Sequence, residues 1–193
     1  FRFSILGSFN STGDLISGEA NVGSTNGVSP YDGSRMLTVS ESPLGGTPQA
    51  FLAWVTNLSI GQSVTACFYG YDDTPTSPSM RIWGNWTDSN TDINEYSGSA
   101  SGNNDYTNDS GWNQVCHTWT VSESEDVGLV IQARLYSGSD DPTIYFIDFI
   151  EVTAPTSSII NYPGGTDGLS GCTDATAPEY DPAAEQDDGS CWG

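Results

Sequence analysis

The feature of this sequence that most constrains its fold is a short-range alternation of side chains. Between Val127 and Tyr136, apolar residues at every second position alternate with other residues, the period of a strand with one face in a core. Segments of similar length recur between turn residues, and none has a sustained helical period. This spacing predicts an all-β protein, either a β-sandwich or a jelly roll. The expected strands are Phe1–Phe9, Arg35–Glu41, Ala50–Leu58, Ser63–Tyr71, Met80–Trp86, Gln114–Val121, Val127–Tyr136 and Thr143–Val152.

The sequence also predicts how the chain is divided. Between Ile144 and Ile150 both sets of alternating positions are apolar except for Asp148, which predicts a central strand. The long polar stretch between Thr87 and Gly111 is typical of a functional or mobile loop. Residues rich in Pro, Gly, Ser and Thr then predict a linker. The expected parts are a sandwich of residues 1–153, a linker of residues 154–170 and a small acidic disulfide loop of residues 171–193.

The charge balance excludes two classes of partner. The chain has 193 residues, with 25 Asp and Glu against four Arg and no Lys, a formal net charge of −21. This charge repels phosphate backbones and anionic lipids, and no apolar stretch approaches the ~20 residues of a membrane span. We therefore expect neither nucleic-acid binding nor membrane insertion. The acidic surface either attracts cations such as calcium or only keeps the protein soluble. The start at Phe1 is expected to follow removal of a signal peptide, although a trimmed chain would begin in the same way.

The cysteines indicate an oxidising compartment. Cys67, Cys116, Cys172 and Cys191 have no C-x-x-C spacing, and the chain has one His, so a zinc site is not expected. Three pairings are possible. Because the last two cysteines lie beyond the expected linker, local pairing favours Cys67–Cys116 and Cys172–Cys191. Each disulfide is expected to stabilise the fold by about 2–4 kcal/mol and implies a secreted, extracellular or cell-surface protein.

Four N-x-Ser/Thr sequons permit glycosylation of such a protein without demonstrating it. They lie at Asn10, Asn57, Asn85 and Asn108.

Five segments in order resemble one family. GSFNSTGD, YDGSRMLTV, IGQSVTACFYGY, GWNQVCHTWTV and TIYFIDFIEV resemble the galactose-binding-like jelly-roll carbohydrate-binding modules over about residues 4–153. The resemblance implies a β-sandwich with a concave face, aromatic platforms for sugars and a structural calcium ion near the chain's start and last strand. By position, the calcium ligands would be Asn10, Asp32 and Asp148, with Asn10 where the family usually has Glu.

The tail resembles a second module. GCTDATAPEYDPAAEQDDGSC, residues 171–191, is similar to a short acidic disulfide module of large secreted microbial surface proteins. The resemblance implies secretion and a modular surface protein but no activity. Its aspartates are further candidate calcium ligands, because calcium takes six to eight oxygen ligands; the alternative is solvated turn carboxylates. They are Asp174, Asp181, Asp187 and Asp188.

Sugar recognition needs flat rings and polar side chains close together. In the Met80–Trp86 segment, Arg81, Trp83 and Asn85 share one face and Trp86 lies on the other, so one Trp is expected in the core and one as a platform. The alternative is that Trp83, Trp112 and Trp119 are all core or corner residues. The further candidates are Tyr69 and Tyr71, on a strand expected to be adjacent, and Tyr96 and Tyr106, in the polar stretch.

Catalytic motifs are missing from the sequence. The single His117 lies beside Cys116 in a strand, and there is no G-x-S-x-G, no H-E-x-x-H and no phosphate loop. A glycosidase carboxylate pair leaves no local signature. We predict a secreted, non-catalytic protein that binds polysaccharides or glycoprotein glycans. The alternative is a structural subunit of an extracellular filament, sheath or matrix that polymerises with itself, by addition of the strand FRFSILGSF to a neighbour or through calcium.

Overall fold

The chain divides into two compact units, Phe1–Pro163 and Gly164–Gly193. The structure, a computed structural model, describes residues 17–22, 24–25, 27–33, 36–41, 49–72, 80–103, 106–107, 111–136, 143–162, 170–172, 174–178, 180, 186–187 and 191. The expected strand Phe1–Phe9 lies outside the described residues.

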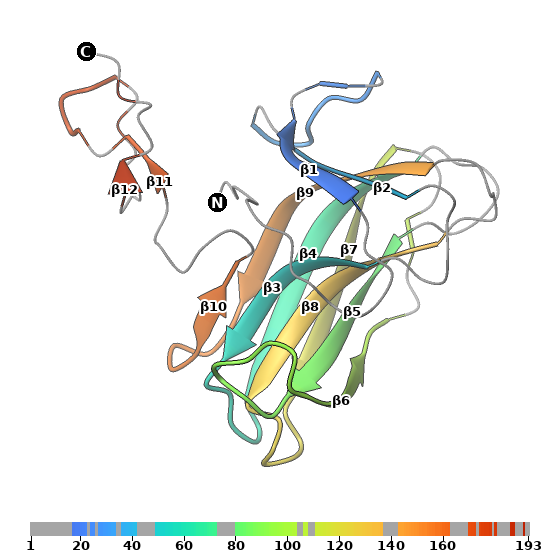
Figure 1. Cartoon of the computed structure of the whole chain (residues 1–193), viewed down its shortest axis with the longest axis vertical. Coiled ribbons are helices and arrows are strands. Elements are labelled where there is room, and N and C mark those ends of the chain that lie inside the picture. Colours follow the sequence, from blue (N-terminus) through green and yellow to red (C-terminus); the bar gives the residue numbers. More distant parts are fainter. Residues whose placement is uncertain are drawn as a thin grey trace. The chain divides into compact units, whose positions relative to one another are not determined.

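Two antiparallel sheets form the first unit (Figure 1). The first sheet has the order β1-β2-β9-β4-β7, and the second has the order β10-β3-β8-β5-β6. The strands of this unit are β1 Ser17–Val22, β2 Met36–Glu41, β3 Gln49–Thr56, β4 Ser63–Asp72, β5 Met80–Thr87, β6 Tyr96–Ser101, β7 Gly111–Thr120, β8 Gly128–Leu135, β9 Thr143–Thr153 and β10 Ile159–Asn161.

The strand order is that of a jelly roll. From β2 to β9, successive strands alternate between the sheets except at the β5–β6 hairpin, which gives the four-stranded orders β2-β9-β4-β7 and β3-β8-β5-β6. β1 and β10 extend one edge of each sheet. The predicted all-β jelly-roll sandwich is therefore confirmed.

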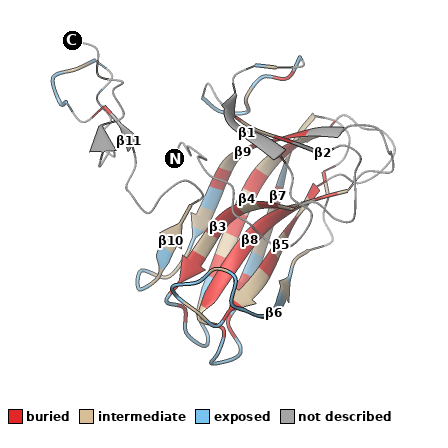
Figure 2. Ribbon diagram, in the orientation of Figure 1, coloured by how far each residue is buried: buried red, intermediate tan, exposed pale blue. Residues whose placement is uncertain are grey.

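The main core lies between the sheets, where apolar residues of every second position meet. Figure 2 shows buried residues along β3 and β8. β8 is buried on both faces, unlike the half-buried strand that its alternation predicts, because it is the central strand of its sheet and its outer side chains are covered too. The largest buried side chains of the core include Phe68, Leu52, Met80, Ile82, Leu129, Ile131 and Leu135.

A β-bulge divides the central strand β9. Asp148 pairs with Tyr69 and Glu151 with Cys67, so β9 has one extra residue here, and Phe149 has a φ of 49°. The bulge reverses the alternation: Ile150 lies in the main core, whereas Phe146 packs in a second, smaller cluster with Val28 and Met36. The prediction that β9 is a central strand is correct, and apolar residues occupy both of its faces because each face has its own cluster.

Two strands form where the sequence predicts a loop and a linker. β6 lies within the polar stretch and pairs with β5, and β10 lies within residues 154–170 and pairs with β3. The sandwich unit consequently continues to Pro163 instead of ending at residue 153. Neither strand has an apolar alternation that sequence analysis can detect: β6 reads YSGSAS and is almost entirely exposed.

Both disulfides have the pairing favoured by the sequence. Cys67 and Cys116 are direct cross-strand partners in β4 and β7, with Cα atoms 4.1 Å apart. In the second unit, Cys172 pairs with Cys191, and β11 (Ser170–Gly171) runs parallel to β12 (Gln186–Asp187). No helix within the described ranges has the length and apolar character to cross a bilayer.

Candidate functional site

The candidate site lies on the outer face of the second sheet. A Cβ placed on Gly84 would lie 2.9 Å from both Leu129 and Trp119, which are core side chains, so Gly84 faces the interior. Side chains one position away along β5 therefore face outward. Their cross-strand partners on β8 point to the same side. We call this surface the arginine–tryptophan face; it consists of Arg81, Trp83, Asn85, Gln132 and Arg134.

Two arginines pack on one tryptophan in this face. The guanidinium carbon of Arg134 lies 4.0 Å from the centroid of the Trp83 ring, and that of Arg81 lies 4.4 Å from it. Arg81 also lies 5.5 Å and 5.4 Å from the ring centroids of Tyr106 and Tyr136. Trp83 thus holds the two arginines in this structure and is not a bare platform.

Several polar atoms of the arginine–tryptophan face are buried without a partner. In the part of the chain that the structure describes, no hydrogen bond reaches Gln132 Oε1, Trp83 Nε1 or Arg134 Nε. Gln132 is only 1% exposed. A buried polar atom without a partner costs about 1–3 kcal/mol, which favours a water molecule or a ligand at this position.

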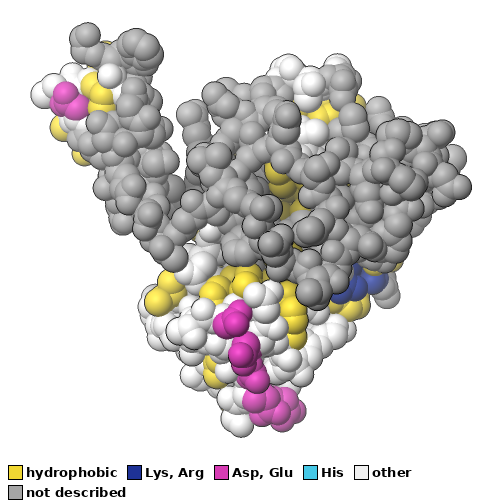
Figure 3. Space-filling view, in the orientation of Figure 1, with side chains coloured by type: hydrophobic (Ala, Val, Ile, Leu, Met, Phe, Trp, Pro, Cys, Tyr) yellow, Lys and Arg dark blue, Asp and Glu magenta, His cyan; other side chains and the backbone are white. Residues whose placement is uncertain are grey.

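The electrostatic surroundings of Arg134 are unusual for this acidic chain. Burial lowers the pKa of its guanidinium below the usual value, the neighbouring Arg81 charge lowers it further, and the Tyr136 hydroxyl acts in the opposite direction. Figure 3 shows arginine side chains (dark blue) at the surface beside hydrophobic side chains (yellow). Because Arg81 and Arg134 are the described arginines, these atoms belong to this face.

Some site residues could not be singled out from sequence. The alternating segment Val127–Tyr136 contributes Gln132, Arg134 and Tyr136 to the site or its border. Phe51, on β3, is the cross-strand partner of Gln132. A signal did exist: the polar positions of an otherwise apolar strand carry one of only four arginines. Local sequence does not give the order of strands in the sheet, so it could not predict that Arg134 lies opposite Arg81.

The other predicted aromatic residues lie elsewhere. The expectation that Tyr69 and Tyr71 lie on a strand adjacent to β5 is wrong, because β4 pairs with β7 and β9 in the first sheet. There Tyr69 stacks on Tyr31 with ring centroids 3.6 Å apart, and Tyr71 packs in the smaller cluster. Trp86 packs against the main core.

Two further predicted tyrosines belong to the second sheet and its surroundings. Tyr96 begins the edge strand β6 and is 43% exposed. It pairs with Thr87, at the opposite end of β5 from Arg81, and so lies away from Trp83. Tyr106 contacts Tyr136 edge to face and lies near Arg81. Of the two, only Tyr106 borders the arginine–tryptophan face.

Two of the three calcium ligands implied by resemblance are adjacent. The backbone N–H of Asp32 donates to Asp148 Oδ2 at 3.1 Å, and the N–H of Phe149 donates to Oδ1 at 2.8 Å. Burial raises the pKa of the Asp148 carboxyl, against the effect of these N–H groups. Asn10 lies outside the described residues, and no cluster of three or more His, Cys, Asp or Glu occurs among those that are described. The two carboxylates suit calcium but supply only part of its usual ligands, so this site stays a prediction.

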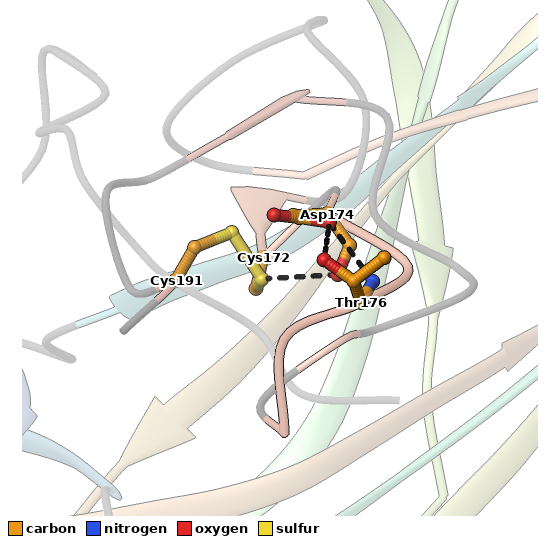
Figure 4. Close-up of a disulfide and its surroundings, with 4 residues drawn as sticks. All are labelled: Cys172, Asp174, Thr176 and Cys191. Atoms are coloured by element: carbon orange, nitrogen blue, oxygen red, sulfur yellow. Dashed lines mark hydrogen bonds between the residues drawn. A yellow bond between two sulfur atoms is a disulfide. The ribbon is translucent and has the colours of Figure 1, made fainter. Parts of the chain in front are cut away.

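In the tail, the one aspartate whose side chain is described closes a local turn. Asp174 Oδ1 accepts hydrogen bonds from the N–H and the hydroxyl of Thr176, at 2.8 and 2.7 Å (Figure 4). Both hydrogen bonds lower the pKa of the exposed Asp174 carboxyl, and the bond from the Thr176 hydroxyl has the larger effect. The side chains of Asp181, Asp187 and Asp188 are not described, so a calcium site in the tail stays a prediction as well.

The remaining candidates were the single histidine and the sequons. His117 makes an edge-to-face contact with Trp119, ring centroids 4.8 Å apart, and burial lowers the pKa of its imidazole. Asn57 is exposed, and Asn85 is half-buried on the arginine–tryptophan face. Asn10 and Asn108 lie outside the described residues.

Comparisons with known proteins give distant structural likenesses. No protein-family model matches the sequence, and no curated protein matches it. The chain is similar to the CBM22-2 xylan-binding domain of Paenibacillus barcinonensis Xyn10C, at 18% identity, 72% coverage of this chain, 88% of that one and a TM-score of 0.47. The CBM22-1 domain of the same protein is 13% identical, with 72% of this chain and 81% of that one covered and a TM-score of 0.43. The K1 cleaved adhesin domain of Lys-gingipain from Porphyromonas gingivalis is 14% identical, with 75% of this chain and 86% of that one covered and a TM-score of 0.41. Because these TM-scores are below 0.5, the jelly-roll assignment rests on the strand order of this chain.

Proposed function

We propose that this protein is a secreted, non-catalytic carbohydrate-binding protein, and that it binds glycans on the arginine–tryptophan face. The observation that carries the proposal is the set of unpartnered polar atoms around a half-buried Trp83. Trp83 Nε1 and Arg134 Nε are donors and Gln132 Oε1 is an acceptor, which matches the mixed hydrogen bonding of sugar hydroxyls. Phe51 and Tyr106 add apolar ring surface of the kind that packs on pyranose C–H groups.

The location and the lack of catalysis belong to the same proposal. The two disulfides support an oxidising, extracellular compartment. The single His117 faces Trp119 and lies on a strand of the other sheet, so the proposal assigns it no role at the glycan site.

A glycan array with matched variants tests the proposal. We expect binding of one glycan class by the intact protein and a loss of at least tenfold in affinity for Trp83→Ala, because both arginines lose their support. Trp112→Ala is the matched control: Trp112 is also half-buried but lies on β7, in the other sheet, and its substitution should leave binding unchanged. A blank array, or equal effects of the two substitutions, would contradict the proposed site.

A second candidate is a self-assembling structural subunit. β6 is at the end of the second sheet's strand order, is almost entirely exposed and has no charged or proline residue, features that leave a strand edge open to pairing. If neighbours add a strand here, Gly98→Lys should abolish concentration-dependent assembly in sedimentation velocity while the melting temperature stays the same. A protein that remains monomeric at high concentration, with and without calcium, would exclude this candidate.

A further inference from the structure

The arginine–tryptophan face concentrates positive charge in a protein that has almost none. Arg81 and Arg134 are two of four basic residues, against 25 acidic ones, yet they are direct cross-strand partners. Like charges opposite each other in a sheet are destabilising unless an anion or ring stabilises them. Trp83 supplies the ring: both guanidinium carbons lie within 4.4 Å of its centroid.

Arg134 retains hydrogen-bonding capacity for an anion. Its Nε has no partner within the described ranges, although it is buried. Burial lowers the pKa of its guanidinium, Tyr136 acts in the opposite direction, and the charge of Arg81 lowers the pKa further.

The neighbouring atoms are arranged for a sugar that carries the anion. Gln132 is two residues from Arg134 on the same side of β8, is 1% exposed and has an unpartnered Oε1 acceptor. Trp83 Nε1 adds a donor. A guanidinium fork binds an anionic group through two parallel hydrogen bonds, while the amide acceptor is free for a hydroxyl.

We propose that the arginine–tryptophan face recognises an acidic saccharide, with Arg134 binding the anionic substituent and Gln132 accepting from a hydroxyl. This inference rests on the proposed glycan-binding function and specifies its ligand class. A uronic-acid carboxylate and a sulfate ester share the required chemistry. The net charge of the protein repels both at long range, but this repulsion is screened beyond about 8 Å at physiological salt, so contact with the Arg134 guanidinium decides binding.

The test uses an array of acidic polysaccharides, each beside its neutral counterpart. Uronate polymers are compared with their carboxyl-reduced forms, and sulfated galactans with their desulfated forms, at 150 mM salt with EDTA to remove calcium bridges. We expect affinity to fall about 10- to 100-fold when the anionic group is removed, the range of a charge-assisted hydrogen bond. Which pair shows the loss identifies carboxylate or sulfate.

Variants localise the effect to Arg134. Arg134→Gln should lose about as much affinity for the acidic ligand as removal of its anionic group, and Arg134→Lys, which keeps the charge without the fork, should lose less. Arg35→Gln removes an equal charge directly before β2 in the sequence and should bind like the intact protein. A thermal melt of each variant confirms folding.

The outcomes separate the two proposals. Equal binding of acidic and neutral forms, or binding of neutral glycans alone, overturns the acidic-saccharide inference and leaves glycan binding intact. Acidic binding that is unaffected by Arg134→Gln and Arg134→Lys in folded protein also overturns the inference. Binding of no saccharide of any kind overturns both.

Discussion

Gly128, at the start of β8, is a position where one added methyl group should be costly. A Cβ here would lie 2.9 Å from Trp54 Nε1, 3.2 Å from the Val55 carbonyl oxygen and closer still to Thr87 Oγ1. Thr87 is 0% exposed; its hydroxyl accepts from Trp54 Nε1 at 3.2 Å and donates to the Ser89 carbonyl at 3.1 Å. Gly128→Ala must therefore displace this hydroxyl or the backbone of β8.

The magnitude follows from those contacts. Overpacking of a filled site costs about 1–3 kcal/mol, and each of the two hydrogen bonds contributes about 1 kcal/mol. Against this, Ala in place of Gly gains about 0.5 kcal/mol from the unfolded state. We expect the free energy of unfolding to fall by about 3 kcal/mol. Gly98→Ala on β6 is the control, because no atom lies within 4 Å of its added Cβ; its effect should stay within about 0.5 kcal/mol.

Urea unfolding followed by tryptophan fluorescence, with disulfides intact, measures both variants. A double-mutant cycle identifies the cause: in a Thr87→Ala background, Gly128→Ala should cost less, because one clashing hydroxyl is gone. If Gly128→Ala and Gly98→Ala unfold at the same urea concentration, the packing deduced around Gly128 is incorrect.

Three other predictions follow from the described contacts. Replacing Cys67 and Cys116 together by Ala should lower stability by about 4 kcal/mol, from the chain-entropy relation for their separation of 49 residues, in urea unfolding; an unchanged midpoint would contradict it. The folded-state pKa of His117 lies below its unfolded value, so folding stability is present above about pH 6.5 and falls as the pH drops below that value. His117→Gln should lose less stability than the intact protein between pH 7.5 and 5.5, and parallel curves would refute this. If Asp148 binds calcium, excess chelator should lower the melting temperature of the intact protein by several degrees but not that of Asp148→Asn; an unchanged melt with no metal in the purified protein would remove this site.

Strand positions could be predicted where burial imposes a period on the sequence. β4, β5, β8 and β9 each carry apolar residues that the core requires, and each end differs from the prediction by at most one residue. β6 could not be predicted, because an exposed edge strand of Ser and Gly buries almost nothing and so imposes no pattern. The sequence of β10 is equally uninformative, since its three residues pair with β3 from within a segment of linker composition.

The candidate site depended on information that local sequence lacks. The alternation along β5 correctly places Arg81 and Trp83 on one face, but the partners of that face are set by the sheet order. In a jelly roll, β8 lies beside β5, although Arg81 and Arg134 are 53 positions apart in the sequence (134 − 81). By contrast β4, which directly precedes β5 in the chain, belongs to the other sheet. The bulge at Phe149 is a second such case, because it reverses the inward and outward positions within one strand.

The central position of β9 determines the order in which this protein can fold. Since β9 lies between β2 and β4, the first sheet is incomplete until the last long strand of the sandwich has been synthesised. The β4–β7 ribbon and its Cys67–Cys116 bridge need no residue beyond Thr120, so oxidation can precede the arrival of β9. We expect an oxidised intermediate with unpaired β2 and β4 edges, formed slowly because its contacts are non-local. Until β9 pairs, this intermediate would be the species most exposed to aggregation and proteolysis.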